Sequence, residues 1–158
     1  MKIEVIDDNI IVFLNKFIVN NLDYRDSNVL ESELKKIFDK LNKLYNIKIK
    51  GYYDVNLYID NNYGIILELI KDDIGYDDFD EVIDMRILTS DINLLYKIKN
   101  LIPLEIKHKI YFYRNNLYLE IDENIDSIKM GKILENSEII YKNTEDIIKY
   151  GKVLKTML

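Results

Sequence analysis

Residues 71–84, with the sequence KDDIGYDDFDEVID, divide the chain into two parts of similar make-up. This segment holds seven acidic residues and one base, whereas residues 1–70 hold 11 acids and 9 bases and residues 85–158 hold 10 acids and 12 bases. The formal net charge of the chain, −6, therefore equals the charge of this segment. On each side lie a helical pattern and a hairpin of alternating apolar residues, so we predict two similar halves joined by an acidic connector.

The composition sets limits on the class of protein. With 158 residues the chain is one ordinary domain, or two very small ones that share a core. Its 48% of apolar residues suffices to build a hydrophobic core. The absence of cysteine excludes disulfides, thiolate metal sites and a cysteine nucleophile. No signal-peptide pattern opens the chain and no apolar run approaches ~18 residues, so we expect a cytoplasmic protein. Abundant Ile, Asn, Lys and Tyr are typical of an AT-rich bacterium, and the acidic balance disfavours general affinity for nucleic acid.

The first half contains the clearest helical pattern. Asn28 and Glu31 have the spacing of a capping box, and apolar residues then recur at the spacing of one helix face. We expect strands at residues 2–6 and 10–18 before this helix. After it, we expect a hairpin whose loop spans residues 60–64 and whose register places Asn56 beside Glu68. The apolar residues expected to face the core from the helix are Leu30, Leu34, Ile37, Phe38, Leu41, Leu44 and Tyr45.

In the second half we predict a strand over residues 82–88 and a short helix that begins at Ser90 and ends before Pro103. A hairpin with an Asn115-Asn116 turn follows, with Ile110 opposite Ile121. The expected remainder is a helix over residues 125–135, an extended segment at 137–141, a short helix that ends at Gly151, and a last strand at 152–157. The fold class predicted is α+β, with antiparallel sheets of hairpins covered by helices: a 1–70 half, a 71–84 connector and an 85–158 half.

Motifs for chemistry are largely missing from the sequence. His108, the one histidine, stands between two lysines, and we interpret it as an exposed strand-edge residue rather than a general base. There is no nucleophile elbow and no phosphate-binding loop, and a single histidine without cysteine does not suit zinc. The connector acids do not match an EF-hand, so they favour a solvated loop, or a loop that docks on a basic partner surface. We therefore expect no enzyme, no metal and no cofactor.

The second hairpin supplies the candidate contact surface. Residues 107–114 mix bases with aromatics, which is the material of a base-stacking platform, but the glycines of the RRM signature are absent. Sheet packing or a protein partner is favoured over RNA. The alternation places Phe112 on the core face and three tyrosines on an exposed face. The candidate partner-binding residues are Tyr111, Tyr113 and Tyr118 of the hairpin, with Asp77, Asp78, Asp80 and Glu81 of the connector.

The order of elements resembles that of the MecA family, adaptors that present substrates to the Clp chaperone–protease of low-GC Gram-positive bacteria. Residues 1–6 with Ile11 and Phe13 are similar to its opening hairpin, residues 110–122 to its Tyr-rich hairpin, and residues 150–154 to its closing motif. The resemblance implies an amino-terminal half that binds substrate and a carboxyl-terminal half that docks on a Clp ATPase. The family joins its halves by a long charged linker, whereas only residues 71–84 join them here.

These patterns lead to one main functional hypothesis and two alternatives. The main one is a non-enzymatic adaptor or regulatory protein that acts by binding other proteins. One alternative is a single-stranded nucleic-acid binder that uses the hairpin at residues 107–118, and the other is a phage or mobile-element inhibitor of a host factor. An exposed edge strand in either hairpin also permits a homodimer through sheet extension.

Overall fold

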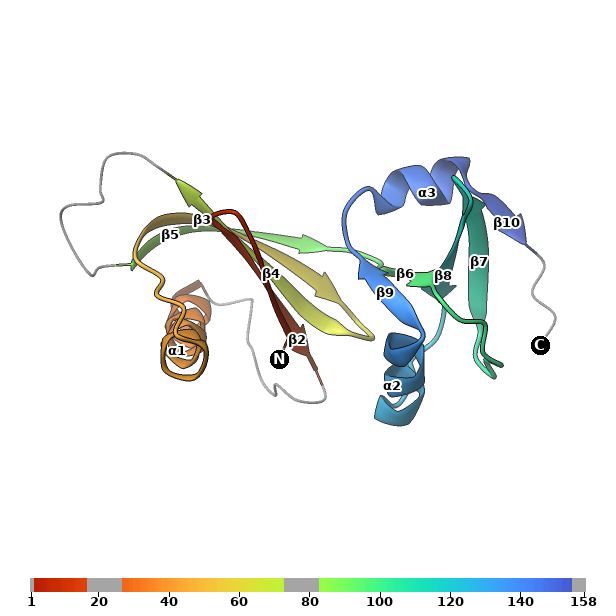
Figure 1. The fold of residues 1–158 in the computed structure, drawn as a ribbon, viewed down its shortest axis with the longest axis horizontal. Coiled ribbons are helices and arrows are strands. Elements are labelled where there is room, and N and C mark those ends of the chain that lie inside the picture. Colours follow the sequence, from red (N-terminus) through yellow and green to blue (C-terminus); the bar gives the residue numbers. More distant parts are fainter. Residues whose placement is uncertain (1, 17–26, 73–82, 155–158) are drawn as a thin grey trace. The chain divides into compact units, whose positions relative to one another are not determined.

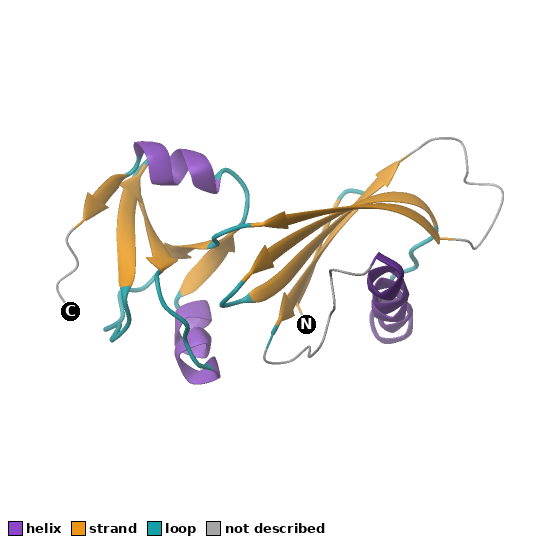
Figure 2. Cartoon of the chain, turned by 180° about the vertical axis from the view of Figure 1, so that it is seen from behind, coloured by secondary structure: helices purple, strands orange, loops and turns teal. Residues whose placement is uncertain are grey.

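A computed structural model describes residues 2–16, 27–72 and 83–154, and these ranges contain three helices and ten strands. The strands form two five-stranded sheets rich in antiparallel pairs, with helices beside them, which confirms the predicted α+β class (Figures 1 and 2). Contacts group the chain into two compact units. Unit 1 comprises Met1–Tyr58 and Ile65–Ser90, and unit 2 comprises Ile59–Gly64 and Asp91–Leu158. None of the helices in the described ranges is long and apolar enough to cross a membrane.

Unit 1 is built on the sheet β1-β2-β4-β3-β5. Its elements are β1 (Lys2–Ile6), β2 (Asn9–Asn15), α1 (Ser27–Tyr45), β3 (Gly51–Asp60), β4 (Gly64–Asp72) and β5 (Ile83–Asp91). The first two strands pair as predicted around a tight turn, with Ile6 opposite Asn9 and with Asp7 at a positive φ of 54°. The backbone of aspartate tolerates this left-handed conformation better than that of most residues.

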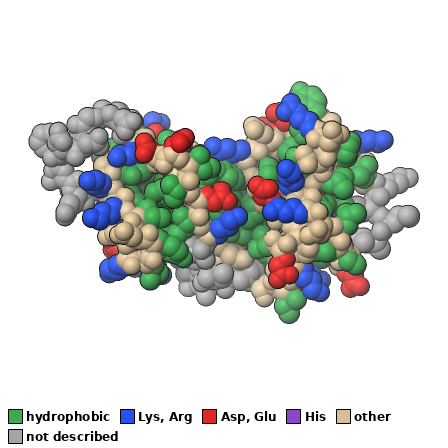
Figure 3. Space-filling view, viewed as in Figure 1, with side chains coloured by type: hydrophobic (Ala, Val, Ile, Leu, Met, Phe, Trp, Pro, Cys, Tyr) green, Lys and Arg blue, Asp and Glu red, His purple; other side chains and the backbone are tan. Residues whose placement is uncertain are grey.

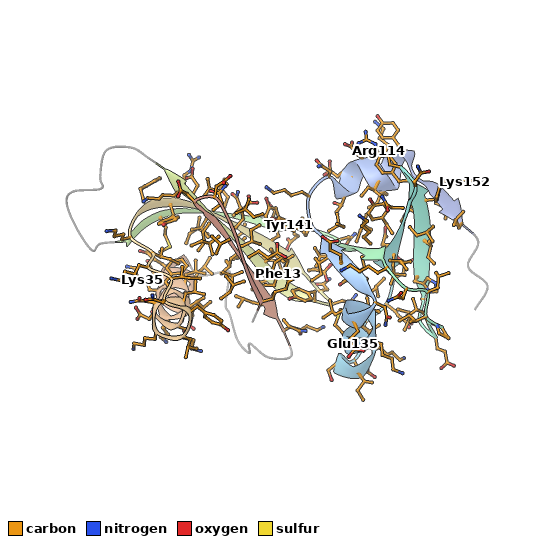
Figure 4. The ribbon with its side chains drawn as sticks, in the orientation of Figure 1. Phe13, Lys35, Arg114, Glu135, Tyr141 and Lys152 are labelled. Atoms are coloured by element: carbon orange, nitrogen blue, oxygen red, sulfur yellow. The ribbon has the colours of Figure 1, made fainter. Side chains whose placement is uncertain are left out.

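The helix α1 confirms the amphipathic pattern of the sequence, whereas Asn28, predicted to cap it, lies inside the helix after Ser27. Five of its seven predicted core residues, Leu30 to Leu41, are buried. The last two, Leu44 and Tyr45, are 71% and 48% exposed, so their predicted inward position is wrong, because they occupy the last turn of the helix. The opposite side of α1 carries Lys35, which points away from the sheet in Figure 4 and forms an i,i+4 ion pair with Glu31 at 3.2 Å.

In the hairpin β3–β4, Asn56 lies beside Glu68, as the predicted register requires. Asn56 Nδ2 donates to Glu68 Oε1 at 3.1 Å across the two strands. The face that carries this pair is buried on β4, where Ile66 and Glu68 are only 1% and 4% exposed. The strand β4 lies inside the sheet, between β2 and β3.

Unit 2 is built on the sheet β10-β7-β8-β6-β9. Its elements are β6 (Leu95–Ile98), β7 (His108–Tyr113), β8 (Asn116–Ile121), α2 (Ser127–Glu135), β9 (Ser137–Ile140), α3 (Thr144–Tyr150) and β10 (Lys152–Leu154). The α2 helix begins at an aspartate cap, in which the Asp126 carboxylate accepts from Lys129 N at 2.8 Å. The order of elements after residue 107 follows the prediction closely.

Of the two elements predicted for residues 82–98, the strand at residues 82–88 is confirmed as β5 (Ile83–Asp91), and the helix is wrong. The short helix expected after Ser90 is absent, and Leu95–Ile98 form the strand β6 between β8 and β9. Leu94, Leu95 and Tyr96 are all at least 97% buried, so this run has no polar face and suits a strand covered on both sides. The strand β5 belongs to the first sheet, and the turn Ile59–Gly64 groups with unit 2. The boundary between the units therefore differs from the predicted halves.

The hairpin β7–β8 turns one residue earlier than predicted. Arg114 and Asn115 both have positive φ, 45° and 62°, as a two-residue type I′ turn requires. Ile110 consequently lies opposite Leu119, instead of opposite Ile121. The slip changes the pairing by two residues, so the division of side chains between the two faces is preserved.

Candidate functional site

The tyrosines predicted to form an exposed contact patch lie largely in a core. Tyr111 and Tyr118 are only 4% and 9% exposed, and they pack with Leu95 and with Ile147 of α3. Tyr113 is partly buried against the same cluster. The prediction of an exposed tyrosine face is therefore wrong, because α3 covers that face of the sheet. The other half of the predicted site, Asp77, Asp78, Asp80 and Glu81, lies outside the described residues.

The buried tyrosines make specific contacts within unit 2. The Tyr111 hydroxyl donates to Glu120 Oε2 at 3.0 Å, and burial together with this hydrogen bond raises the pKa of Tyr111 to about 12. The Arg114 guanidinium lies 5.1 Å from the centroid of the Tyr113 ring, at the end of the hairpin (Figure 4). Tyr111 and Tyr118 thus offer no free ring face on which a base can stack.

An apolar groove of about 550 Å³ lies on the opposite face of the same sheet. None of the described side chains that line it is charged. The loop after β6 forms one wall, and this loop is anchored by Asn136, whose carbonyl oxygen accepts from Lys99 N at 2.8 Å and from Asn100 N at 3.2 Å. The main apolar residues of this groove are Ile98, Leu101, Ile110, Leu117, Ile133 and Leu154.

Apolar side chains reach the surface around this groove. Leu101 is 76% exposed although it lines the groove, and Phe112, which lies two residues from Ile110 on the same face of β7, is 42% exposed. Figure 3 shows hydrophobic side chains gathered on the side of unit 2 where β7 and β10 lie. Exposed apolar patches of this kind are typical of interaction surfaces.

His108 also lines the groove, which corrects its interpretation as an exposed strand-edge residue. Its Nδ1 lies 2.6 Å from the carbonyl oxygen of Ile106. Since a carbonyl oxygen can only accept, Nδ1 donates this hydrogen bond. Nε2 is buried and has no hydrogen-bond partner in the described structure. The histidine therefore adds a polar group to a wall that also contains Asn100, Asn136 and Ser137.

A second pocket in unit 2, of about 360 Å³, is acidic. It lies between the turn at residues 60–62, the start of β6 and the segment 120–124 that ends β8. Asparagine side chains from these segments fill much of the wall, and no lysine, arginine or histidine is among the described residues that line it. We call this the acidic pocket, and its four carboxylate residues are Asp60, Glu120, Asp122 and Glu123.

The wall of the acidic pocket is fixed by hydrogen bonds to the backbone. Asp60 Oδ2 accepts from Asn62 N at 3.0 Å and from Tyr63 N at 2.8 Å, while Asp60 Oδ1 accepts from Leu94 N at 3.1 Å. Asn62 Oδ1 accepts from Ile125 N at 3.2 Å. These bonds join the turn to segments far away in the sequence, so the pocket is a built part of unit 2.

Tyr96 is the residue that stands out in this wall. Its side chain is 1% exposed, and its hydroxyl has no hydrogen-bond partner in the described structure. Burial, the charge of Asp60 and the neighbouring Tyr63 hold the pKa of Tyr96 well above its usual value of 10.0, so the hydroxyl keeps its proton. Within the described ranges no three carboxylate or imidazole groups converge as ligands of a metal ion.

The buried tyrosines give a testable dependence of stability on pH. Burial raises the pKa of Tyr63 from 10.0 to about 12. In the unfolded chain this tyrosine ionises first, so raising the pH above 10 favours the unfolded state. We expect the free energy of unfolding contributed by Tyr63 to be constant below pH 10 and to be lost as the pH rises to about 12. Urea unfolding at a series of pH values measures this, and Tyr63→Phe should show a smaller fall; an equal fall in the variant contradicts the assignment.

Comparison with known proteins adds no relative. No protein-family model, no curated protein and no solved structure matches the chain. The resemblance of its element order to the MecA family therefore stays a hypothesis.

Sequence reasoning missed most of the groove and the acidic pocket. The apolar run at residues 101–104, which surrounds the one proline, was a usable signal for an exposed apolar loop. The acidic pocket had no such signal, because its residues come from three segments around positions 60, 94 and 122.

Proposed function

We propose that this chain is a non-enzymatic protein-interaction module and that its apolar groove binds an apolar segment of another protein. The observation that carries the proposal is the groove of about 550 Å³ without a charged side chain in its described lining. This volume lies in the range of typical binding pockets. Burial of apolar surface there stabilises a complex by roughly 25 cal/mol per Å² before the costs of association.

The position of β10 supports an extended peptide as the occupant. This strand is an edge of its sheet, and its residue Leu154 lines the groove. A peptide that pairs with the edge can direct every second side chain toward the groove, as in β-strand addition. The buried ring of Tyr111 removes one of the stacking residues on which the single-stranded nucleic-acid alternative depends.

The resemblance to the MecA family suggests the first partner to test. It implies a Clp ATPase as the protein on which the carboxyl-terminal part docks, and we propose that unit 2, which holds the groove, provides that contact. An adaptor role, in which unit 1 binds the substrate, follows from the same resemblance. The inhibitor of a host factor is a protein-binding function of the same kind, and the identity of the partner separates the two.

We expect Leu101→Asp to weaken binding of a protein partner at least about tenfold, because it places a charge in an apolar groove. Leu101 is 76% exposed, so the fold should tolerate the change. The matched control is Ile128→Asp, at a residue 71% exposed on α2 that does not line the groove. The measurement is a crosslinking pull-down from the source cells, followed by a titration with the recovered protein and with a purified Clp ATPase.

The proposal requires a partner that the wild type and the Ile128→Asp variant retain and the Leu101→Asp variant loses. Recovery of the same set of proteins by all three chains contradicts a role of the groove.

A further inference from the structure

The apolar groove continues to an open edge of its sheet. Strand β10 pairs with β7 on one side and has no strand on its other side among the described residues. Its Leu154 lies opposite Ile110, and both residues line the groove. Two positions earlier, Lys152 lies opposite Phe112. Since side chains at alternate positions of a strand point to the same face, Lys152 stands on the groove face of β10 beside Leu154.

This edge carries positive charge that the described part of the chain does not neutralise. Residues 110–117 and 150–154, which form the adjoining ends of β7, β8 and β10, contain the bases Arg114 and Lys152 and no acid. Neither base has an ion-pair partner among the described residues, and the Arg114 guanidinium lies instead over the Tyr113 ring. Figure 4 shows both labelled side chains at the end of unit 2 where β7 ends and β10 begins. A segment that binds along β10 therefore meets cations beside an apolar groove.

The open edge of a sheet selects an extended backbone as its partner. Alternate residues of an edge strand direct their N–H and C=O groups away from the sheet, and an added strand pairs with these groups. The side chains of that strand then stand opposite those of β10, so one of them lies beside Leu154 at the groove and another lies beside Lys152. Opposite charges at directly opposed positions stabilise a strand pair, whereas like charges destabilise it.

We propose that the partner segment is an extended strand that pairs with the edge of β10 and carries an acidic residue two positions from an aliphatic one. The aliphatic side chain lies opposite Leu154 and enters the groove, and the acidic side chain lies opposite Lys152. This inference rests on the proposed protein-binding function and adds the backbone conformation and the charge of the bound segment. A basic residue at the same position of the partner places like charges opposite each other, so Lys152 also rejects unsuitable segments.

The test uses the full chain and capped heptapeptides of the sequence Ser-Leu-Val-Xaa-Val-Leu-Ser, in which Xaa is glutamate, glutamine or lysine. This sequence reads the same in both directions, so it offers the proposed spacing to β10 whether the strands run parallel or antiparallel. Backbone amide shifts are followed during each titration. We expect saturable shifts at residues 98–104, 110–112 and 152–154, with the glutamate peptide about two- to fivefold tighter than the glutamine peptide and the lysine peptide weakest.

A charge swap separates the effect of Lys152 from the general effect of charge. In Lys152→Glu the order should reverse, so that the lysine peptide binds more tightly than the glutamate peptide. Lys152 is exposed, so the fold should tolerate the change. The matched control is Lys129→Glu, which makes the same change of charge at an exposed residue of α2 outside the groove lining and should keep the wild-type order. The wild-type order in Lys152→Glu, or a reversed order in Lys129→Glu, overturns the proposal.

A fourth peptide tests the strand geometry. N-methyl groups on the five central residues of the glutamate peptide remove the amide hydrogens that pair with β10, so this peptide should give no saturable shifts. Saturable binding of the methylated peptide, equal affinities of the three parent peptides for the wild type, or no saturable shifts with any of them also overturns the inference. The pull-down with Leu101→Asp does not depend on these peptides. If that variant still loses its partner, the proposed function stands while this inference fails.

Discussion

The variant Asp60→Ala should lower the free energy of unfolding by about 2–4 kcal/mol, the largest effect that we expect from a single polar residue of this chain. The Asp60 carboxylate accepts three backbone N–H groups, two from its own turn and one from Leu94, 34 residues further along. Hydrogen bonds to a charged acceptor are stronger than neutral ones, and three donors lose their partner together in the alanine variant. The turn at Ile59–Gly64 and the start of β6 should loosen together.

Amide hydrogen exchange gives the most direct measurement. The backbone amides of Asn62, Tyr63 and Leu94 should lose protection in Asp60→Ala, and urea unfolding should report the lower stability. Asp60→Asn keeps one acceptor oxygen, so it should have an intermediate effect. Asp39→Ala, at an exposed position on α1, is the control and should change stability by less than about 0.5 kcal/mol. If Asp60→Ala matches this control, the three hydrogen bonds do not stabilise the unit.

The local sequence pattern predicted the turn that contains Asp60, but it did not predict the hydrogen bond that the Asp60 carboxylate accepts from a distant segment. An aspartate at the first position of a polar loop is typical of a turn stabilised by its own carboxylate, and the hairpin loop at residues 60–64 was predicted at its correct place. The bond to Leu94 depends on how a distant segment packs, and no periodicity encodes that. The same holds for the acidic pocket, whose acids are separated by about 60 positions in the sequence.

The alternation of residues along β7 and β8 assigned the side chains correctly to two faces of the hairpin. It was wrong, however, in predicting that the tyrosine face is the exposed one. One face carries tyrosines, and the other carries isoleucine, leucine and phenylalanine. Both are apolar enough to be buried, because a tyrosine ring is largely hydrophobic and its hydroxyl needs only one partner. The tyrosine face is buried because Ile147 of the α3 helix packs on it. Glu120 accepts a hydrogen bond from the Tyr111 hydroxyl there. The groove therefore opens on the face predicted to be core.

The second half also shows where periodicity fails. The spacing of Ile92, Leu95 and Ile98 fits a helix, but the intervening Leu94 and Tyr96 are buried as well. A short continuous apolar run is ambiguous between a helix and a covered strand. Residues Leu95–Ile98 form a strand because their backbone pairs with β8 on one side and with β9 on the other. By contrast, α1 and five of its seven predicted core residues are confirmed, because a long segment with one helical period specifies its own buried face.

The variant Gly151→Ala should cost about 1–3 kcal/mol, the usual penalty for overpacking a filled site. Gly151 ends α3, and its N–H donates to Ile147 O at 2.8 Å. Its φ of −69° is open to any residue, so the demand for glycine is purely steric. A Cβ at this position would collide with the carbonyl oxygen of Ile147 and would lie 3.3 Å from Tyr111 Cβ. Either α3 or β7 must shift, and both form the tyrosine core of unit 2.

The chain offers a matched control for this substitution. Gly131 lies inside α2, and an added Cβ there has nothing within 4 Å. Gly131→Ala should therefore raise stability by up to about 1 kcal/mol, the difference in helix propensity between alanine and glycine. Urea unfolding of the two variants beside the wild type tests both signs in one experiment, and the near-ultraviolet dichroism of the tyrosines should change only in Gly151→Ala. A stabilised Gly151→Ala would mean that α3 is not held against Tyr111, and the burial that removes Tyr111 from the recognition surface would then lose its support.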